Sequence, residues 1–195
     1  MARIMETVLQ KSAQGICELS IGALELSDRI IWITEIDSDS AISVVRKMRF
    51  LIAESSDPIT LAISSPGGEV QAGLLMLDAI TTSGVDVVTC CVGTAYSMGA
   101  ILLSAGKKRL ILPNSSVMIH QPLINSCSGG SCDTIDSLAK SLNKTKDKLN
   151  ALLSSYTGKT IEEIEQATKF DNHMSAEEAI AFGLADQIVE FKDIF

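Results

Sequence analysis

Aromatic side chains are scarce in this sequence, where phenylalanine, tyrosine and tryptophan make up only 4% of 195 residues. The core must therefore be built from aliphatic side chains and methionine. Positive charge is scarce too, because 16 lysines and arginines stand against 24 acidic residues, giving a net charge of −8. A nucleic-acid backbone is bound by a basic face, so we expect no nucleic-acid partner.

Long apolar runs are also missing. No stretch approaches the roughly 20 apolar residues that cross a membrane, so we expect no membrane partner. The first fifteen residues lack the apolar centre of a secretory signal peptide. We therefore expect a cytoplasmic protein.

Cysteine is present but not in the pattern of a metal site. The five cysteines are Cys17, Cys90, Cys91, Cys127 and Cys132. Their odd number and their spacing do not match zinc ligands, so no metal is expected. Cys90 and Cys91 lie in an apolar run and should be buried thiols. Cys127 and Cys132 flank a short SerGlyGlySer segment and could pair under oxidation, which leaves their redox state open.

The order of apolar patterns predicts a single α/β domain over residues 18–195, preceded by a flexible, polar N-terminal arm over residues 1–17. Strands are expected over 30–34, 59–64, 85–92, 110–112, 116–119 and 187–191. Helices are expected from Asp39 or Ser40 to Glu54 and over 70–82. This alternation favours mostly parallel pairing.

A longer helix is expected between Ile135 and Tyr156, ended by Gly158. Its apolar positions step by three and four: Ile135, Leu138, Leu142, Thr145, Leu149, Leu152 and Tyr156. A narrow seam of this kind packs either against the parent domain or against another helix, and we favour a subunit contact. Capping boxes then predict two short helices, at Thr160 with Glu163 and at Ser175 with Glu178.

The stretch 85–106 contains the most informative serine. A β-branched strand runs to Gly93, which permits a turn, and Ser97 then opens an apolar helix. A serine there is most often only a helix N-cap. However, the helix N-terminus also provides unpaired N–H groups that favour negative charge, which suits a nucleophile.

A nucleophilic serine needs a base and a group that orients the base. His120 follows an apolar strand and is the candidate base, since the other histidine, His173, lies in a polar connection. Asp171 is the best candidate for the orienting group, with Asp133 and Asp136 as rivals. The oxyanion would need N–H donors, for which the amide of Met98 and those of the 67–68 glycine pair are candidates.

Five motifs together resemble one family. They are SerProGlyGly (65–68), GlyThrAlaTyrSerMetGlyAla (93–100), LeuProAsnSer (112–115), MetIleHisGlnPro (118–122) and SerAlaGluGluAlaIleAlaPheGlyLeuAlaAsp (175–186). From about Ile30 to Val189 the chain resembles the proteolytic subunit of the Clp protease, ClpP. The resemblance implies a crotonase-like fold with a projecting handle region, here about 123–157, and ring formation.

The resemblance also implies roles for individual residues. Ser97 matches the nucleophile, His120 the general base and Asp171 the orienting carboxylate of a serine endopeptidase. Gly68 and Met98 match the oxyanion donors, and we assign substrate contacts to Gly67, Pro122 and Leu123. Members stack two heptameric rings, and an AAA+ unfoldase of the ClpX, ClpA or ClpC type delivers unfolded protein. The unfoldase uses the ATP, so no cofactor is expected for this chain.

Several positions depart from the family pattern. Thr60, Ala62 and Thr82 stand where aromatic residues usually form the unfoldase-docking pocket, which predicts weakened docking. Phe170 replaces an arginine of the ring-to-ring contacts, and Ile124-Asn125 replaces a glycine pair. We therefore expect a divergent second paralogue that forms mixed rings. The alternative is a mainly structural ring subunit whose activity requires that partner.

Two other enzyme classes stay open on the residues alone. A crotonase-fold enzyme that acts on acyl-coenzyme A shares the fold, and a coenzyme A binding test separates it from a peptidase. A Ser–Lys peptidase would use Lys107 or Lys108, which the histidine motif makes unnecessary.

Overall fold

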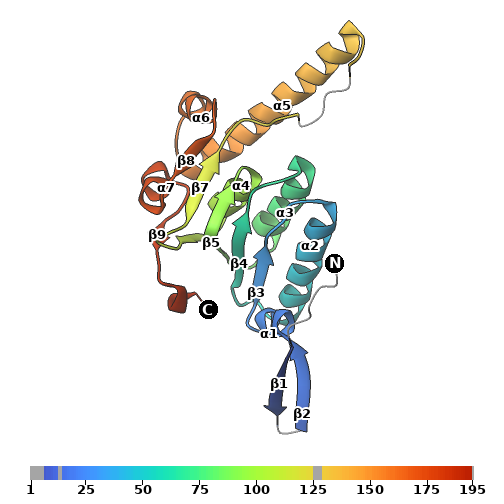
Figure 1. The fold of residues 1–195 in the computed structure, drawn as a ribbon, viewed down its shortest axis with the longest axis vertical. Helices are drawn as coiled ribbons and strands as arrows, with labels where there is room; N and C mark the ends of the chain where they lie inside the picture. Colours follow the sequence, from blue (N-terminus) through green and yellow to red (C-terminus); the bar gives the residue numbers. More distant parts are fainter. Residues whose placement is uncertain (1–6, 13–14, 125–128, 195) are drawn as a thin grey trace.

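The computed structural model describes residues 7–12, 15–124 and 129–194 of the chain. Its centre is a sheet of parallel strands in the order β3-β4-β5-β6-β9 (Figure 1). These strands are Ile30–Ile33 (β3), Ile59–Ser65 (β4), Val87–Tyr96 (β5), Lys108–Ile111 (β6) and Gln187–Ile188 (β9). The prediction of an α/β domain with mostly parallel pairing is confirmed.

Strand β5 is longer than its predicted end at residue 92, because it continues through Gly93 instead of turning there. Over Val88–Cys91 its neighbour is β6, and over Thr94–Tyr96 its neighbour is β7 (Ser116–Ile119). Gly93 has φ +88°, which a glycine adopts without steric cost. The strand therefore changes partner at Gly93, and its last residues lie against the strand that leads to His120.

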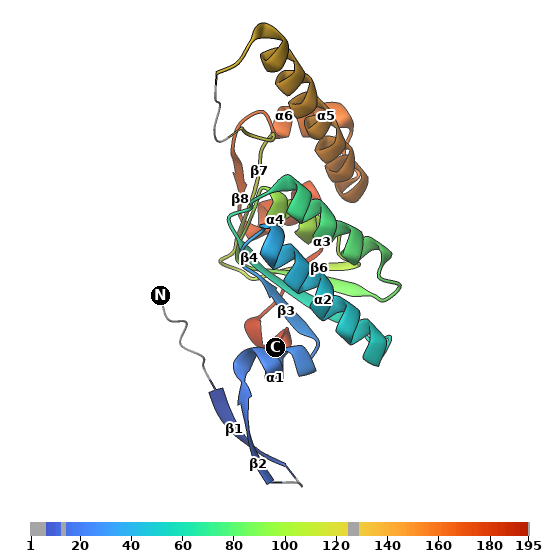
Figure 2. The ribbon, with the colours of Figure 1, turned by 90° about the vertical axis from the view of Figure 1, so that its right-hand side faces the viewer.

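Helices α2 (Ser38–Glu54) and α3 (Val70–Thr82) lie on the same side of the sheet (Figure 2). Each buries residues at helical spacing: Ala41, Val44, Met48 and Leu51 on α2, and Ala72, Met76, Leu77 and Ile80 on α3. The largest fully buried side chains of the described residues are isoleucine, leucine and methionine, as the low aromatic content predicts. The N-cap of α2 is Asp37, in a capping box with Ser40, so the predicted cap at Asp39 or Ser40 was wrong.

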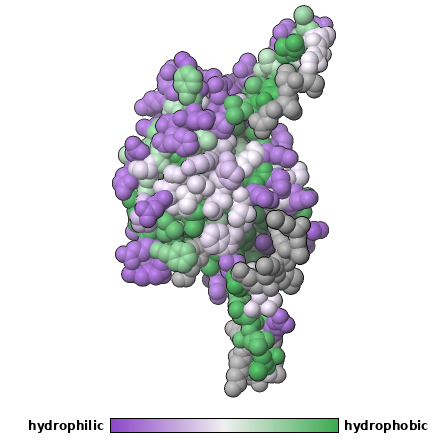
Figure 3. Space-filling view, in the orientation of Figure 1, coloured by the Kyte–Doolittle hydropathy of each residue, from purple (hydrophilic) through white to green (hydrophobic). Residues whose placement is uncertain are grey.

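Helix α5 (Cys132–Thr157) projects from the body of the molecule (Figure 1). Leu149 and Leu153 are buried near its C-terminal end, whereas Ile135 and Leu138 are 52% and 40% exposed near its start. Figure 3 shows hydrophobic side chains along this projecting part. Gly158 ends the helix in the left-handed conformation, as predicted. The apolar seam is therefore covered by the domain at one end only.

The N-terminal region differs from the predicted irregular arm. Residues Thr7–Ser12 (β1) and Gly15–Ser20 (β2) form an antiparallel hairpin that extends from the domain (Figure 1). Helix α1 (Ile21–Ser27) connects it to β3 and was not predicted. Leu9 and Ile16 are 75% and 71% exposed on the hairpin. Side-chain pairs between the two strands stabilise the hairpin. The strands are too short for their alternation to be recognised in the sequence among polar residues.

The C-terminal part contains both predicted short helices, α6 (Ile161–Ala167) and α7 (Ala176–Phe182), each with its capping box. A short strand, β8 (Asn172–Met174), lies between them and pairs antiparallel with β7. His173 is therefore in a strand and not in a connection. The last strand, β9, is shorter than predicted and is followed by a 3-10 turn, Phe191–Asp193.

Arg109 of β6 connects its strand to the C-terminal region. Its side chain is paired with Asp186 and donates to the carbonyls of Tyr156 at 3.0 Å and Gly183 at 2.7 Å. These bonds connect β6 with the end of α5 and the end of α7. The Arg109 hydrogen bonds are the largest cause that lowers the pKa of Asp186 below its ordinary value.

We expect Arg109→Met to lower the free energy of unfolding by about 2 kcal/mol at pH 7, because two carbonyls and a carboxylate lose a charged donor. The Asp186 carboxyl group has a depressed folded-state pKa. Its contribution is therefore present above the unfolded value near 4 and is lost as the pH falls through the folded value. Urea unfolding should show that the difference in free energy of unfolding between wild type and variant shrinks from about pH 5 downward. A difference that stays constant over this pH range would contradict the role of Asp186.

Candidate active site

Ser97 lies directly after β5, where helix α4 (Met98–Ser104) begins. Its backbone has φ 56° and ψ −117°, and Ser97 and Arg29 are the non-glycine residues with positive φ in the described ranges. Such conformations cost about 1–3 kcal/mol and often mark functional sites. The hydroxyl makes no capping hydrogen bond to α4. The N-cap alternative is therefore wrong for the Ser97 side chain.

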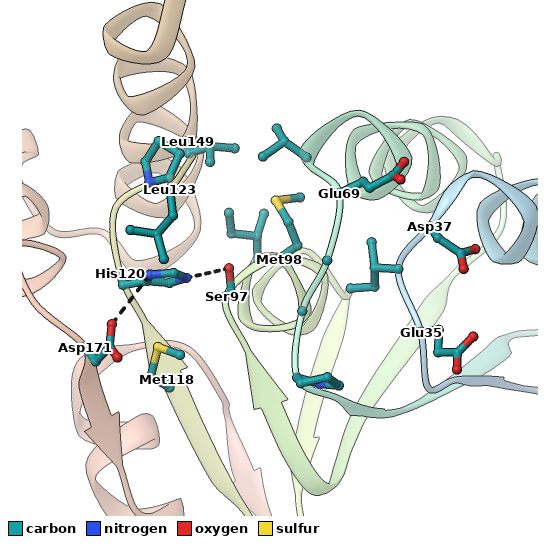
Figure 4. Close-up of a pocket in the computed structure, with 17 residues that line it drawn as sticks. Glu35, Asp37, Glu69, Ser97, Met98, Met118, His120, Leu123, Leu149 and Asp171 are labelled. Carbon is teal, nitrogen blue, oxygen red and sulfur yellow. Dashed lines mark hydrogen bonds and ion pairs between the residues drawn. The ribbon is translucent and has the colours of Figure 1, made fainter. Parts of the chain in front are cut away.

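His120 follows β7 and points at Ser97. Its Nε2 lies 2.8 Å from the Ser97 Oγ, a hydrogen-bond distance (Figure 4). The Ser97 amide also donates to the Met118 carbonyl at 2.8 Å, which fixes the end of β5 against β7. The two side chains that the sequence proposed as nucleophile and base are thus brought together by neighbouring parallel strands.

Asp171 lies on the other side of the His120 ring. Its Oδ1 is 3.6 Å from His120 Nδ1, and the Asp171 side chain is 65% exposed. That separation is too long for a hydrogen bond, and the buried Nδ1 has no hydrogen-bond partner in the described part of the chain. The three side chains lie in a row, and the distance between His120 and Asp171 is longer than the distance between Ser97 and His120.

The placement of Asp171 depends on β8, which the sequence did not predict. Ile119 of β7 pairs with Asn172, so the residue before Asn172 comes beside the residue after Ile119. Gln121 also holds the segment that precedes Asp171. Its backbone amide donates to the Thr168 carbonyl at 2.8 Å, and its side-chain amide donates to the Lys169 carbonyl at 3.2 Å. The rivals Asp133 and Asp136 are exposed in the first turns of α5 and do not line the site.

Gly67 passes close to Ser97, and Gly68 passes close to Ile36. Gly67 has φ +99°, and a Cβ atom there would lie 2.7 Å from the Ser97 Cβ. At Gly68 a Cβ atom would lie 2.1 Å from the Ile36 carbonyl oxygen. Only glycine fits both positions. The Met98 amide is at the first position of α4, where N–H groups lack a helical acceptor.

These residues line one cavity of about 710 Å³. It includes Ser97, His120, Asp171, the two glycines and Met98, and also the expected substrate contacts Pro122 and Leu123. Apolar side chains of Ile101 and Leu149 line it too, so α5 contributes to the site as well as projecting from the domain. The heptad pattern gave no indication of that second role for Leu149.

The sequence also missed an acidic part of the cavity lining. Glu35, Asp37 and Glu69 line it on the side away from His120 and Asp171 (Figure 4). Asp37 accepts from the Ser40 amide at 2.8 Å, and this backbone hydrogen bond is the main reason for its lowered pKa. These carboxylates come from segments with no chemical motif of their own.

Other predicted residues lie outside the cavity. Lys107 and Lys108 are exposed beside the start of β5, at the opposite end of that strand from Ser97, which argues against a Ser–Lys pair. Phe170 is 77% exposed next to Asp171. Of the positions proposed for weakened docking, Thr60 is half-buried and Thr82 exposed, whereas Ala62 is fully buried, so its methyl group is not on the surface of this chain.

Two of the cysteines are buried structural thiols, as expected. Cys90 and Cys91 are free and fully buried, and burial raises the pKa of each to about 12. Cys132 is exposed and has no disulfide partner among the described residues. Cys127 lies outside the described residues, as does Asn125, so pairing of Cys127 with Cys132 stays a prediction. Among the described residues no group of His, Cys, Asp and Glu is arranged to hold a metal ion. None of the described helices is long and apolar enough to cross a membrane.

One comparison with known proteins bears on this site. A family model described as Clp protease matches residues 14–192, which include every element from β3 to β9 and every residue of the cavity. The mixed α/β fold with its parallel sheet agrees with this match.

Proposed function

We propose, from the premise that this chain belongs to the Clp protease family, that it is a serine endopeptidase subunit. Ser97 would be the nucleophile, His120 the general base and Asp171 the orienting carboxylate. The observation that carries this proposal is the 2.8 Å contact between Ser97 Oγ and His120 Nε2 inside the 710 Å³ cavity.

The geometry supports an acyl-enzyme mechanism. His120 Nε2 takes the proton of Ser97 Oγ as the oxygen attacks the peptide carbonyl carbon, and it then gives the proton to the leaving amine. The N–H groups of Gly68 and Met98 would stabilise the oxyanion, a contribution of about 3 kcal/mol per donor. A water activated by His120 hydrolyses the ester and frees Ser97. No cofactor enters this scheme.

The substrate we propose is unfolded polypeptide. The two ends of the molecule support assembly, because α5 and the hairpin expose apolar side chains that a monomer leaves uncovered (Figure 3). We infer that copies of this chain cover these apolar faces and assemble into two stacked heptameric rings in the cytoplasm. Polypeptide would be delivered by an AAA+ unfoldase, which would hydrolyse the ATP.

The second candidate is a ring subunit whose activity requires a paralogous partner. The 3.6 Å separation between His120 and the exposed Asp171 favours it, since a neighbouring subunit that shields Asp171 would strengthen that link. The absence of aromatic residues at Thr60 and Thr82 would leave unfoldase docking to the partner.

Hydrolysis of a short fluorogenic peptide by the purified protein, without ATP, tests the two candidates. Short peptides reach a chamber by diffusion, so the first candidate predicts hydrolysis by this chain alone. Hydrolysis only after mixing with a paralogous ring supports the second, and a rate in that mixed ring that Ser97→Ala leaves unchanged identifies a mainly structural subunit. Hydrolysis by this chain alone that Ser97→Ala does not lower contradicts both.

We expect Asp171→Asn to lower kcat by only about 10- to 100-fold. Triads with a short hydrogen bond to the carboxylate lose about 10⁴-fold on the same change. The longer 3.6 Å contact and the exposed carboxylate give Asp171 less influence on the imidazole. Steady-state kinetics measures the effect, with Asp136→Asn on α5 as the control. A loss of 10⁴-fold would show that the contact closes fully in the working enzyme.

A further inference from the structure

Two rings outside the cavity join the strands that carry the proposed triad. Tyr96 of β5 and His173 of β8 are in edge-to-face contact, with ring centroids 5.2 Å apart and planes at 88°. Tyr96 pairs with Met118 of β7, and Met118 pairs with His173. The ring contact therefore spans the intervening strand and links two strands that are not hydrogen-bonded to each other.

The positions of the two rings in the chain are significant. Tyr96 directly precedes Ser97, and His173 follows Asp171 by two residues. Neither ring lines the cavity, so neither touches a bound substrate there. The Tyr96 hydroxyl is 2.7 Å from the Ser116 hydroxyl of β7, which fixes the direction of the tyrosine ring. Tyr96 is thus held in a fixed orientation at the end of the strand that precedes Ser97.

Strand β8 needs such a support. It has only three residues, and in the described part of the chain it pairs with β7 and no other strand. The segment before it is held by Gln121. Beyond Asp171, β8 is held by its pairing with β7, by the Tyr96 ring contact and by the burial of Met174 in the core. A small tilt of β8 would move Asp171, whose contact with His120 is already at 3.6 Å.

We propose that the Tyr96–His173 contact is a positioning device that keeps Asp171 beside His120. His173 is a positioning residue and takes no part in the proton transfers. This inference rests on the proposed function, because it assigns a purpose to the strand that carries the third triad member. An edge-to-face pair contributes enough to change a rate about fivefold.

The test uses the full-length protein in the same state of assembly that hydrolyses a short fluorogenic peptide. His173→Ala should lower kcat about fivefold and change KM less than twofold, because substrate contacts stay intact. His173→Phe should restore most of the rate, since it keeps a ring at the contact. Phe50→Ala removes an exposed ring from α2 and serves as the control, with unchanged kinetics.

A double-mutant comparison separates positioning from a general loss of stability. If His173 acts through Asp171, then His173→Ala should have almost no further effect on kcat in an Asp171→Asn background. A full fivefold loss in that background would overturn the proposal. So would equal rates for His173→Ala and wild type.

A crystal structure of His173→Ala gives an answer that does not depend on activity. The proposal predicts that Asp171 Oδ1 moves beyond 4 Å from His120 Nδ1, and an unchanged separation would overturn it. If Ser97→Ala retained wild-type activity, the proposed function would fail, whereas this structural result would still decide whether His173 positions Asp171.

Discussion

Ser97→Ala is expected to lower kcat/KM for peptide hydrolysis by at least about 10⁴-fold. The Oγ atom forms the covalent bond in the proposed mechanism, and nucleophile deletions in other triads cost this much or more. The remaining rate would come from the oxyanion donors and from binding. The change removes one oxygen at a half-buried position, so the fold and the assembly should be unaffected.

Ser104→Ala is the matched control. Ser104 is at the last position of the same helix, and its buried hydroxyl donates to the Ile101 carbonyl at 2.9 Å. Its loss perturbs α4, but Ser104 itself does not line the cavity, so activity should stay within about twofold of wild type. Equal losses in the two variants would mean that α4 stability, and not the Ser97 nucleophile, controls the rate.

Gly67→Ala should lower kcat/KM by about 10²-fold while the protein stays folded. The new methyl group would lie 2.7 Å from Ser97 Cβ and 2.9 Å from the Tyr96 carbonyl oxygen. Tyr96 ends β5 and Ser97 follows it, so this junction must shift to relieve the contacts. Displacements of about 1 Å in a nucleophile have costs of this size. Steady-state kinetics with the same peptide measures the loss.

Gly84→Ala separates this steric effect from backbone strain. Gly84 has a similarly unfavourable φ of +77°, but nothing lies within 4 Å of a Cβ atom built there. Backbone strain should therefore cost both variants about 1 kcal/mol of stability. The close contacts add to that cost in Gly67→Ala, and only this variant should lose activity. Normal kinetics for Gly67→Ala would show that the glycine is not in contact with the nucleophile in solution.

The local patterns around Ser97 and His120 made them the candidate nucleophile and base, and the family resemblance then assigned them those roles. Each follows an apolar run that reads as a buried strand, and parallel neighbours bring their carboxyl ends to one edge of the sheet. Caps and helix ends such as Thr160 and Gly158 were also predictable, because their hydrogen bonds lie within a few residues.

The features that were missed depend on contacts between distant segments. Strand β8 has three residues, too few for any periodicity, and exists because β7 offers it a free edge. The acidic lining formed by Glu35, Asp37 and Glu69 comes from two loops that meet only in the folded chain. The length of the contact between His120 and Asp171 likewise depends on how β8 is held, which no pattern in the sequence encodes.

The most direct test of the central claim is the site of covalent modification by a fluorophosphonate, a reagent that reacts with activated serines. Intact mass spectrometry followed by peptide mapping should show one adduct per chain, on Ser97, formed far more slowly in His120→Ala. An adduct on another serine, or labelling of Ser97 at the same rate without His120, would contradict the claim that this pair forms the reactive centre.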